Sequence, residues 1–158
     1  MMPTQSLPPA TTKVEERTGN DADQRRRLAL IPGLDLERGL AMIRGNVQKY
    51  TRVLVVFANS NQLHADRIAA LLAAGDLAAI DLLAQSLKGS AGMLGALNVA
   101  EAARAVVSAL RDQDGAARIQ LLCANLGEAL STLIDGIRQA TAGGLEPVAT
   151  EVDAANSA

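Results

Sequence analysis

The chain has 158 residues, 49% of them hydrophobic, and its 15 basic and 17 acidic side chains leave a formal net charge of −2. This length allows one sizeable core, and the balanced charge, with no Lys/Arg-rich stripe, excludes the electrostatic signature of a nucleic-acid-binding protein. Since no apolar run approaches the roughly 20 residues of a membrane helix and no signal segment is recognisable, we expect a cytoplasmic protein without membrane insertion. Abundant alanine and leucine beside two aromatic residues, one Tyr and one Phe, favour an all-α fold.

The two ends of the chain differ in composition from its middle. Residues 1–30 combine Pro, Thr, Ser and mixed charges without apolar periodicity, so we expect a disordered leader or linker there. A Gly-Gly pair followed by a proline stops the last helical pattern, and residues 143–158 are expected to form a flexible tail. The predicted folded domain is therefore 31–142.

Two helices are expected at the start of this domain. Asp35 can cap a short first helix that stops at Gly45. The next segment, 47–60, follows the i, i+4, i+7 spacing of a buried helical stripe, although three valines in it leave a strand as the alternative. The stripe consists of Tyr50, Leu54 and Phe57.

The third and fourth segments are separated by a stop and a start signal. Segment 62–74 ends at Gly75, and Asp76 can cap the fourth segment, 77–96. The fourth segment keeps its apolar residues on one helical face. These residues are Ile80, Leu83 or Ala84, Leu87, Ala91 and Leu94. The opposite face carries Asp81, Gln85, Lys88 and Gly92.

The last two segments complete a bundle. Asn98 is expected to cap the fifth segment in a capping box with Glu101. The sixth segment, 116–141, spaces its apolar residues by three and four, a pattern that requires helix partners. Its stripe consists of Ile119, Leu122, Leu126, Leu130, Leu133 and Ile137. Long helices with short connections pack most simply as an antiparallel four-helix bundle, preceded here by one or two short N-terminal helices.

The fourth segment contains three glycines within seven residues, Gly89, Gly92 and Gly95. Each of them costs about 1 kcal/mol relative to alanine inside a helix. Either a partner approaches the backbone closely at this place, or Gly89 and Gly92 permit tight packing between helices while Gly95 ends the helix. The spacing alone leaves both interpretations open.

The residues around these glycines closely resemble the central motif of the histidine phosphotransfer family, His-x-x-Lys-Gly-Ser-x-x-x-Leu-Gly. In this sequence the motif runs from Gln85 through Lys88, Gly89 and Ser90 to a Leu-Gly pair. The resemblance extends to the family's entry segment, its second helix and the stretch before the motif. These correspond to residues 31–45, 50–57 and 63–83. Gln85 occupies the position at which the family carries its acceptor histidine.

The resemblance implies a bundle that presents one imidazole to a receiver-domain aspartate, takes its phosphoryl group and passes it on. A neutral imidazole nitrogen can do this because it has a free lone pair. The amide nitrogen of Gln85 is delocalised into its carbonyl and is not a useful nucleophile. The resemblance also gives Lys88 the role of balancing phosphate charge. The implied docking residues are Ser86, Gly89, Ser90 and Gly92, and exposed Met93 is a further docking candidate.

We therefore expect a two-component phosphorelay module and not an enzyme with its own catalysis. Its expected partners are the receiver domain of a response regulator and/or a hybrid sensor kinase. With Gln85 at the acceptor position it should not carry phosphate, either as a natural pseudo-phosphotransfer protein or as a His-to-Gln variant of an active one. A monomer without a cofactor is expected.

Two alternatives compete with this hypothesis. The apolar stripe of segment 116–141 suits a structural oligomerisation domain. His64, the one histidine, is a second candidate acceptor, but it has no Lys-Gly partner and is interpreted as a surface helix residue. A single histidine near Asp66 and a single cysteine cannot form a metal site, and Cys123 is interpreted as a small core residue.

Overall fold

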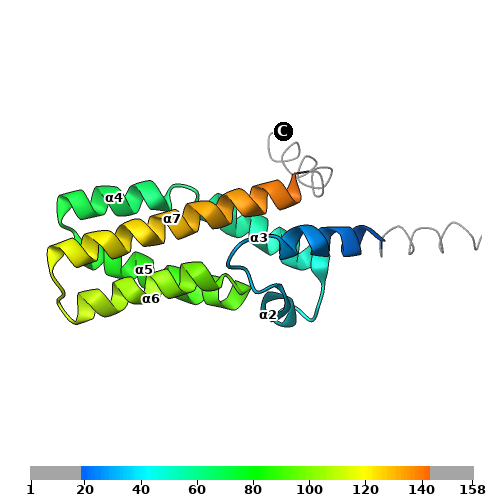
Figure 1. The fold of residues 1–158 in the computed structure, drawn as a ribbon, viewed down its shortest axis with the longest axis horizontal. Helices are drawn as coiled ribbons and strands as arrows, with labels where there is room; N and C mark the ends of the chain where they lie inside the picture. Colours follow the sequence, from blue (N-terminus) through cyan, green and yellow to red (C-terminus); the bar gives the residue numbers. More distant parts are fainter. Residues whose placement is uncertain (1–18, 143–158) are drawn as a thin grey trace, which may run out of the picture.

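The computed structural model of the protein describes residues 19–142, and its regular elements are helices (Figure 1). A first helix occupies residues 19–29 of this range. The others are α2 (Leu36–Ala41), α3 (Val47–Asn61), α4 (His64–Ala74), α5 (Leu77–Leu94), α6 (Leu97–Arg111) and α7 (Ala116–Thr141). The only β contact in the described range is an isolated bridge between Leu34 and Ala96. The all-α prediction is confirmed.

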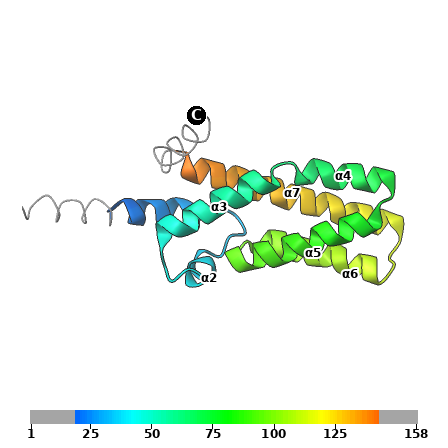
Figure 2. The same ribbon diagram turned by 180° about the vertical axis from the view of Figure 1, so that it is seen from behind.

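The helices form a four-membered bundle in which α3 and α4 together make one member. Both of them lie along the long α7, which spans the length of the bundle (Figures 1 and 2). Around the bundle, α4 packs on α5, α5 on α6, and α6 on α7. The short α2 packs against α3 and α5. Short connections join α4 to α5, α5 to α6 and α6 to α7, so these neighbours run antiparallel.

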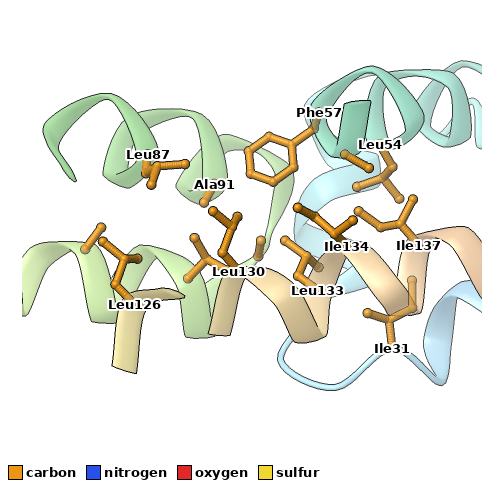
Figure 3. Packing of buried hydrophobic residues seen from close by; sticks show 14 of the residues in the cluster. Ile31, Leu54, Phe57, Leu87, Ala91, Leu126, Leu130, Leu133, Ile134 and Ile137 are labelled. Atoms are coloured by element: carbon orange, nitrogen blue, oxygen red, sulfur yellow. The ribbon is translucent and has the colours of Figure 1, made fainter. Parts of the chain in front are cut away.

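The stripe of α7 lies inside this bundle. Figure 3 shows Leu130 and Leu133 facing Phe57 of α3 and the α5 residues Leu87 and Ala91. All members of the predicted stripe are buried except Leu122, which is half-buried. The stripe therefore packs against other helices of the same chain and is not available to a second copy. The oligomerisation hypothesis loses the observation on which it was based.

The segment with three valines is helical, so the strand alternative is wrong. Tyr50 and Leu54 are fully buried, whereas Val56 is 61% exposed. The 3.6-residue period of the large apolar side chains thus outweighs the β propensity of the valines.

The expectation of disorder is wrong for residues 19–29, which form a helix docked on the bundle. Leu28 is fully buried. Two hydrogen bonds add to this contact: Gln24 Nε2 donates to the Ala140 carbonyl at 3.1 Å, and Gln48 Nε2 donates to Asp21 Oδ1 at 2.9 Å. Because Leu28 is the one buried apolar side chain of this helix, the sequence of residues 19–29 shows no apolar periodicity that would predict the helix. Residues 1–18 of the predicted leader and the predicted tail, 143–158, lie outside the described residues.

The helix caps confirm two predictions and correct a third. Asp35 accepts from Arg38 N, and Asp76 accepts from Ala79 N, each at 3.1 Å. Asn98 does not cap α6, which begins one residue earlier without a side-chain cap. The Leu97 N–H is satisfied instead by the Gly33 carbonyl at 2.8 Å, so the entry loop supplies the cap.

Candidate functional site

The orientation of α5 is set by its buried face and its two ends. Ile80, Ala84, Leu87 and Ala91 are at most 1% exposed. Gly75 and Gly95, which end α4 and α5, both have the left-handed backbone conformation typical of a C-terminal stop. Burial of the apolar face leaves the opposite side of α5 in solvent, and this side contains the sequence motif.

The C-terminal end of α5 is anchored by two hydrogen bonds from outside the helix. The Tyr50 hydroxyl donates to the Leu94 carbonyl at 2.6 Å, and the Asp35 N–H donates to the Gly95 carbonyl at 2.7 Å. Burial, with a smaller contribution from the charge of Asp35, raises the pKa of Tyr50 above its ordinary value of 10. The phenol therefore remains protonated and keeps donating.

Gln85 lies near the middle of the exposed side of α5. Its Nε2 donates to Asp81 Oδ2, one helical turn earlier, at 3.0 Å. At about 100° per residue, Gly89 and Gly92 lie within about 40° of Gln85 around the helix axis. Lys88 lies about 60° to one side and Met93 about 80° to the other. We call these five residues, Gln85, Lys88, Gly89, Gly92 and Met93, the α5 face.

The two serines of the motif are peripheral to this face. Ser86 and Ser90 are exposed, but Ser90 lies about 140° around the axis from Gln85. The Ser90 hydroxyl donates to the Ser86 carbonyl at 3.0 Å, a bond within the helix. The structure thus brings together most of the residues predicted from the motif and leaves Ser86 and Ser90 beside them.

The glycines of the α5 face do not serve packing between helices. A Cβ atom added at Gly89 or at Gly92 would meet nothing within 4 Å, so the tight-packing interpretation is wrong for both. Gly95 does more than end the helix, because a Cβ atom there would collide with the Asp35 carbonyl. Open space above Gly89 and Gly92 is compatible with the docking interpretation, which stays a prediction.

Gly89→Ala is expected to raise the free energy of unfolding by up to about 1 kcal/mol, because alanine is favoured over glycine in a helix interior and no neighbour opposes the methyl group. The midpoint of urea unfolding measures this change. A loss of stability would mean that a part of the chain packs on Gly89.

A groove beside Gln85 was not predicted. It has a volume of about 660 Å³ and lies between α5, the end of α6 and the start of α7. Gln85, Lys88 and Asp81 line it from α5, and Arg111 and Asp114 line it from the other side. The groove joins residues some 25 positions apart, so no local motif contains it. The antiparallel pairing of α5 and α6 was the available signal, since it brings the end of α6 to the start of α5.

His64 is the first residue of α4 and is half-buried. Burial, and to a smaller extent the charge of Arg67, lower the pKa of His64 below 6.5. Cys123 is buried as expected. Within residues 19–142 there is no group of three His, Cys, Asp or Glu side chains that could hold a metal ion. None of the described helices is long and apolar enough to cross a membrane.

The fold and the site define a helical-bundle module that presents one solvent-exposed helix face with a glutamine, a lysine and two glycines. The model of the Hpt domain family matches residues 52–143, more than half of the chain, and the chain belongs to this family. No curated protein and no solved structure matches it. Membership identifies a phosphorelay signalling module of the carrier type, which is not an enzyme with its own catalysis.

Proposed function

We propose that the chain docks receiver domains through the α5 face and does not itself carry a phosphoryl group. One observation supports this proposal: the chain belongs to the Hpt family, and its exposed Gln85 has the spacing to Lys88 and Gly89 that the acceptor histidine has in the motif it resembles. The receiver belongs to a response regulator and/or a hybrid sensor kinase. The chain acts as a cytoplasmic monomer.

The chemistry of residue 85 supports inactivity. Phosphoryl transfer to a side chain needs a nucleophilic lone pair, and the amide nitrogen of glutamine does not offer one. Gln85 Nε2 already behaves as a donor, since it bonds to Asp81 Oδ2 at 3.0 Å. Lys88 keeps its position one turn beyond, so the electrostatic surroundings of an acceptor are retained without the acceptor.

The surroundings of Gln85 support docking. Gly89 and Gly92 leave the helix backbone open to a partner. Two large apolar side chains, Leu82 and Met93, are 71% and 59% exposed on α5. Large apolar side chains that gather on one exposed helix face are a feature of protein interaction sites.

The test is binding of purified receiver domains to the protein and to Gly89→Leu, measured by calorimetry. An extra side chain in a packed interface costs roughly 1–3 kcal/mol, so we expect affinity to fall about tenfold. Ser131→Leu is the matched control, because Ser131 is an exposed residue of α7 and does not belong to the α5 face. Equal affinities of both variants and the unchanged protein would contradict docking through the α5 face.

A further inference from the structure

The helix formed by residues 19–29, which we call the N-terminal helix, is held on the bundle by few contacts. It lies beside α3 (Figures 1 and 2), and its two buried residues are Leu28 and Gln24. Gln24 Nε2 donates at 3.1 Å to the carbonyl of Ala140, which belongs to the last turn of α7 and has no acceptor role within that helix. An element with so little buried apolar surface has a low free energy of local opening.

The segment that follows the N-terminal helix, residues 30–35, contacts the turn between α5 and α6. We call it the connecting segment. Two main-chain hydrogen bonds join it to this turn: the Asp35 N–H donates to the Gly95 carbonyl at 2.7 Å, and the Leu97 N–H donates to the Gly33 carbonyl at 2.8 Å. The connecting segment therefore holds the C-terminal end of α5 and the first turn of α6 together.

The N-terminal helix and the connecting segment are directly linked. The Ile31 N–H donates to the Leu28 carbonyl at 3.1 Å. Ile31 packs on α7 at Gly136, where an added Cβ atom would lie 3.0 Å from Ile31 Cγ2. Ile31 is also the one fully buried side chain of residues 30–34. Without the N-terminal helix, a single buried side chain would anchor the connecting segment, so we expect the helix and the segment to move together.

We propose that the N-terminal helix is a conformational switch for the α5 face. In its docked position it keeps the connecting segment on the α5–α6 turn, and its release loosens the end of α5 that carries Gly92 and Met93. This inference rests on the proposed function, because the α5 face is the proposed docking site. The docked and released states differ by few contacts, so a small differential interaction shifts their populations.

Release of the N-terminal helix lowers the affinity of the α5 face for a receiver. When the end of α5 is loose, only the fraction of molecules with an ordered end is competent to bind, and the apparent affinity falls by that fraction. The hydrogen bond from the Tyr50 hydroxyl to the Leu94 carbonyl, at 2.6 Å, does not involve the connecting segment. It persists after release, so α5 is loosened and not unfolded.

The first experiment is amide hydrogen exchange of the full chain and needs no partner. Arg26 is an exposed residue inside the N-terminal helix, so Arg26→Pro breaks the helix without removing a buried side chain. The Asp35 amide is then expected to exchange at least about tenfold faster than in Arg26→Ala, which keeps the helix. The Ala79 amide, which Asp76 caps at the other end of α5, should exchange at the same rate in both variants.

A second pair of variants separates local release from a general loss of stability. Leu28→Ala removes the buried apolar side chain of the N-terminal helix, and Ile68→Ala removes a similarly buried side chain from α4. Leu28→Ala should accelerate exchange at Asp35 more than at Ala79. Ile68→Ala should not favour Asp35, because it leaves the N-terminal helix docked. Equal acceleration at both amides in Leu28→Ala would overturn the link between the helix and the end of α5.

The last measurement is calorimetric binding of a receiver domain to Arg26→Pro and Arg26→Ala. We expect affinity about 3–10-fold lower for Arg26→Pro. Unchanged exchange at Asp35 would mean that Ile31 holds the connecting segment without the helix, which overturns the inference whatever receivers do. Faster exchange with equal affinities would overturn the switch and leave the proposed docking function intact. If no receiver binds even the unchanged protein, the docking function fails and the switch fails with it.

Discussion

Gln85→His is expected to change the protein from one that takes no label from a phosphorylated receiver to one that is labelled on a large share of its molecules. The substitution supplies the lone pair that the carboxamide lacks. The site needs no other change, because Lys88 and the open glycines are already in place. Asp81, which now accepts from Gln85 Nε2 at 3.0 Å, can accept from one imidazole nitrogen and leave the other free to attack.

The measurement is transfer of radiolabelled phosphate from a phosphorylated receiver domain to the protein and to Gln85→His, side by side. The label should be lost in acid and kept in base, as for a phosphorylated imidazole. Gln85→Ala is the control for nonspecific labelling. The variant that combines Gln85→His with His64→Ala should be labelled as well as Gln85→His alone.

Two outcomes would contradict this interpretation. Label on the unchanged protein that disappears in His64→Ala would make His64 the acceptor, although its lowered pKa and its place at the start of α4 do not compensate for the missing lysine neighbour. Label on neither protein, with several receivers tried, would remove receiver docking and favour a structural role.

The sequence alone predicted the structural features whose sequence pattern lies within one helix. The bounds of α7, Ala116–Thr141, agree with the predicted segment at both ends, because its stripe is long and a turn precedes it. Asp76 and Gly75 were also recognised as cap and stop from their residue types alone. These features depend on local backbone chemistry, which a single segment contains in full.

The sequence alone did not predict the features that form where segments distant in the sequence come into contact. The helix at 19–29 is held by one buried leucine and by polar contacts to α3 and α7. Most of its stabilisation therefore comes from residues on other helices, which its own sequence does not show. The cap of α6 comes from the Gly33 carbonyl, more than 60 residues away. Arg111 reaches the groove only because α5 and α6 pair antiparallel. These three features have the same physical cause: the residue that makes the contact lies outside the short stretch of sequence over which helical periodicity can be recognised.

Gly95→Ala is expected to lower the free energy of unfolding by about 2–5 kcal/mol. Gly95 has φ +83°, and a left-handed conformation costs a non-glycine residue roughly 1–2 kcal/mol. The added methyl group would also collide with the Asp35 carbonyl and lie 3.1 Å from Gly39 N, and overpacking of this kind costs about 1–3 kcal/mol. These are the atoms of the first hydrogen bond of α2, so relief requires α2 to move away from α5.

Gly75→Ala separates the two contributions. Gly75 ends α4 with φ +74°, but a Cβ atom there would meet nothing within 4 Å, so only the conformational cost of roughly 1–2 kcal/mol applies. Urea unfolding of both variants at an unchanged m value measures the difference. A larger loss for Gly95→Ala would show that contact with α2, and not the turn alone, holds the end of α5. Equal losses of unfolding free energy would mean that α2 moves away from α5 without a measurable cost and does not help to position the α5 face.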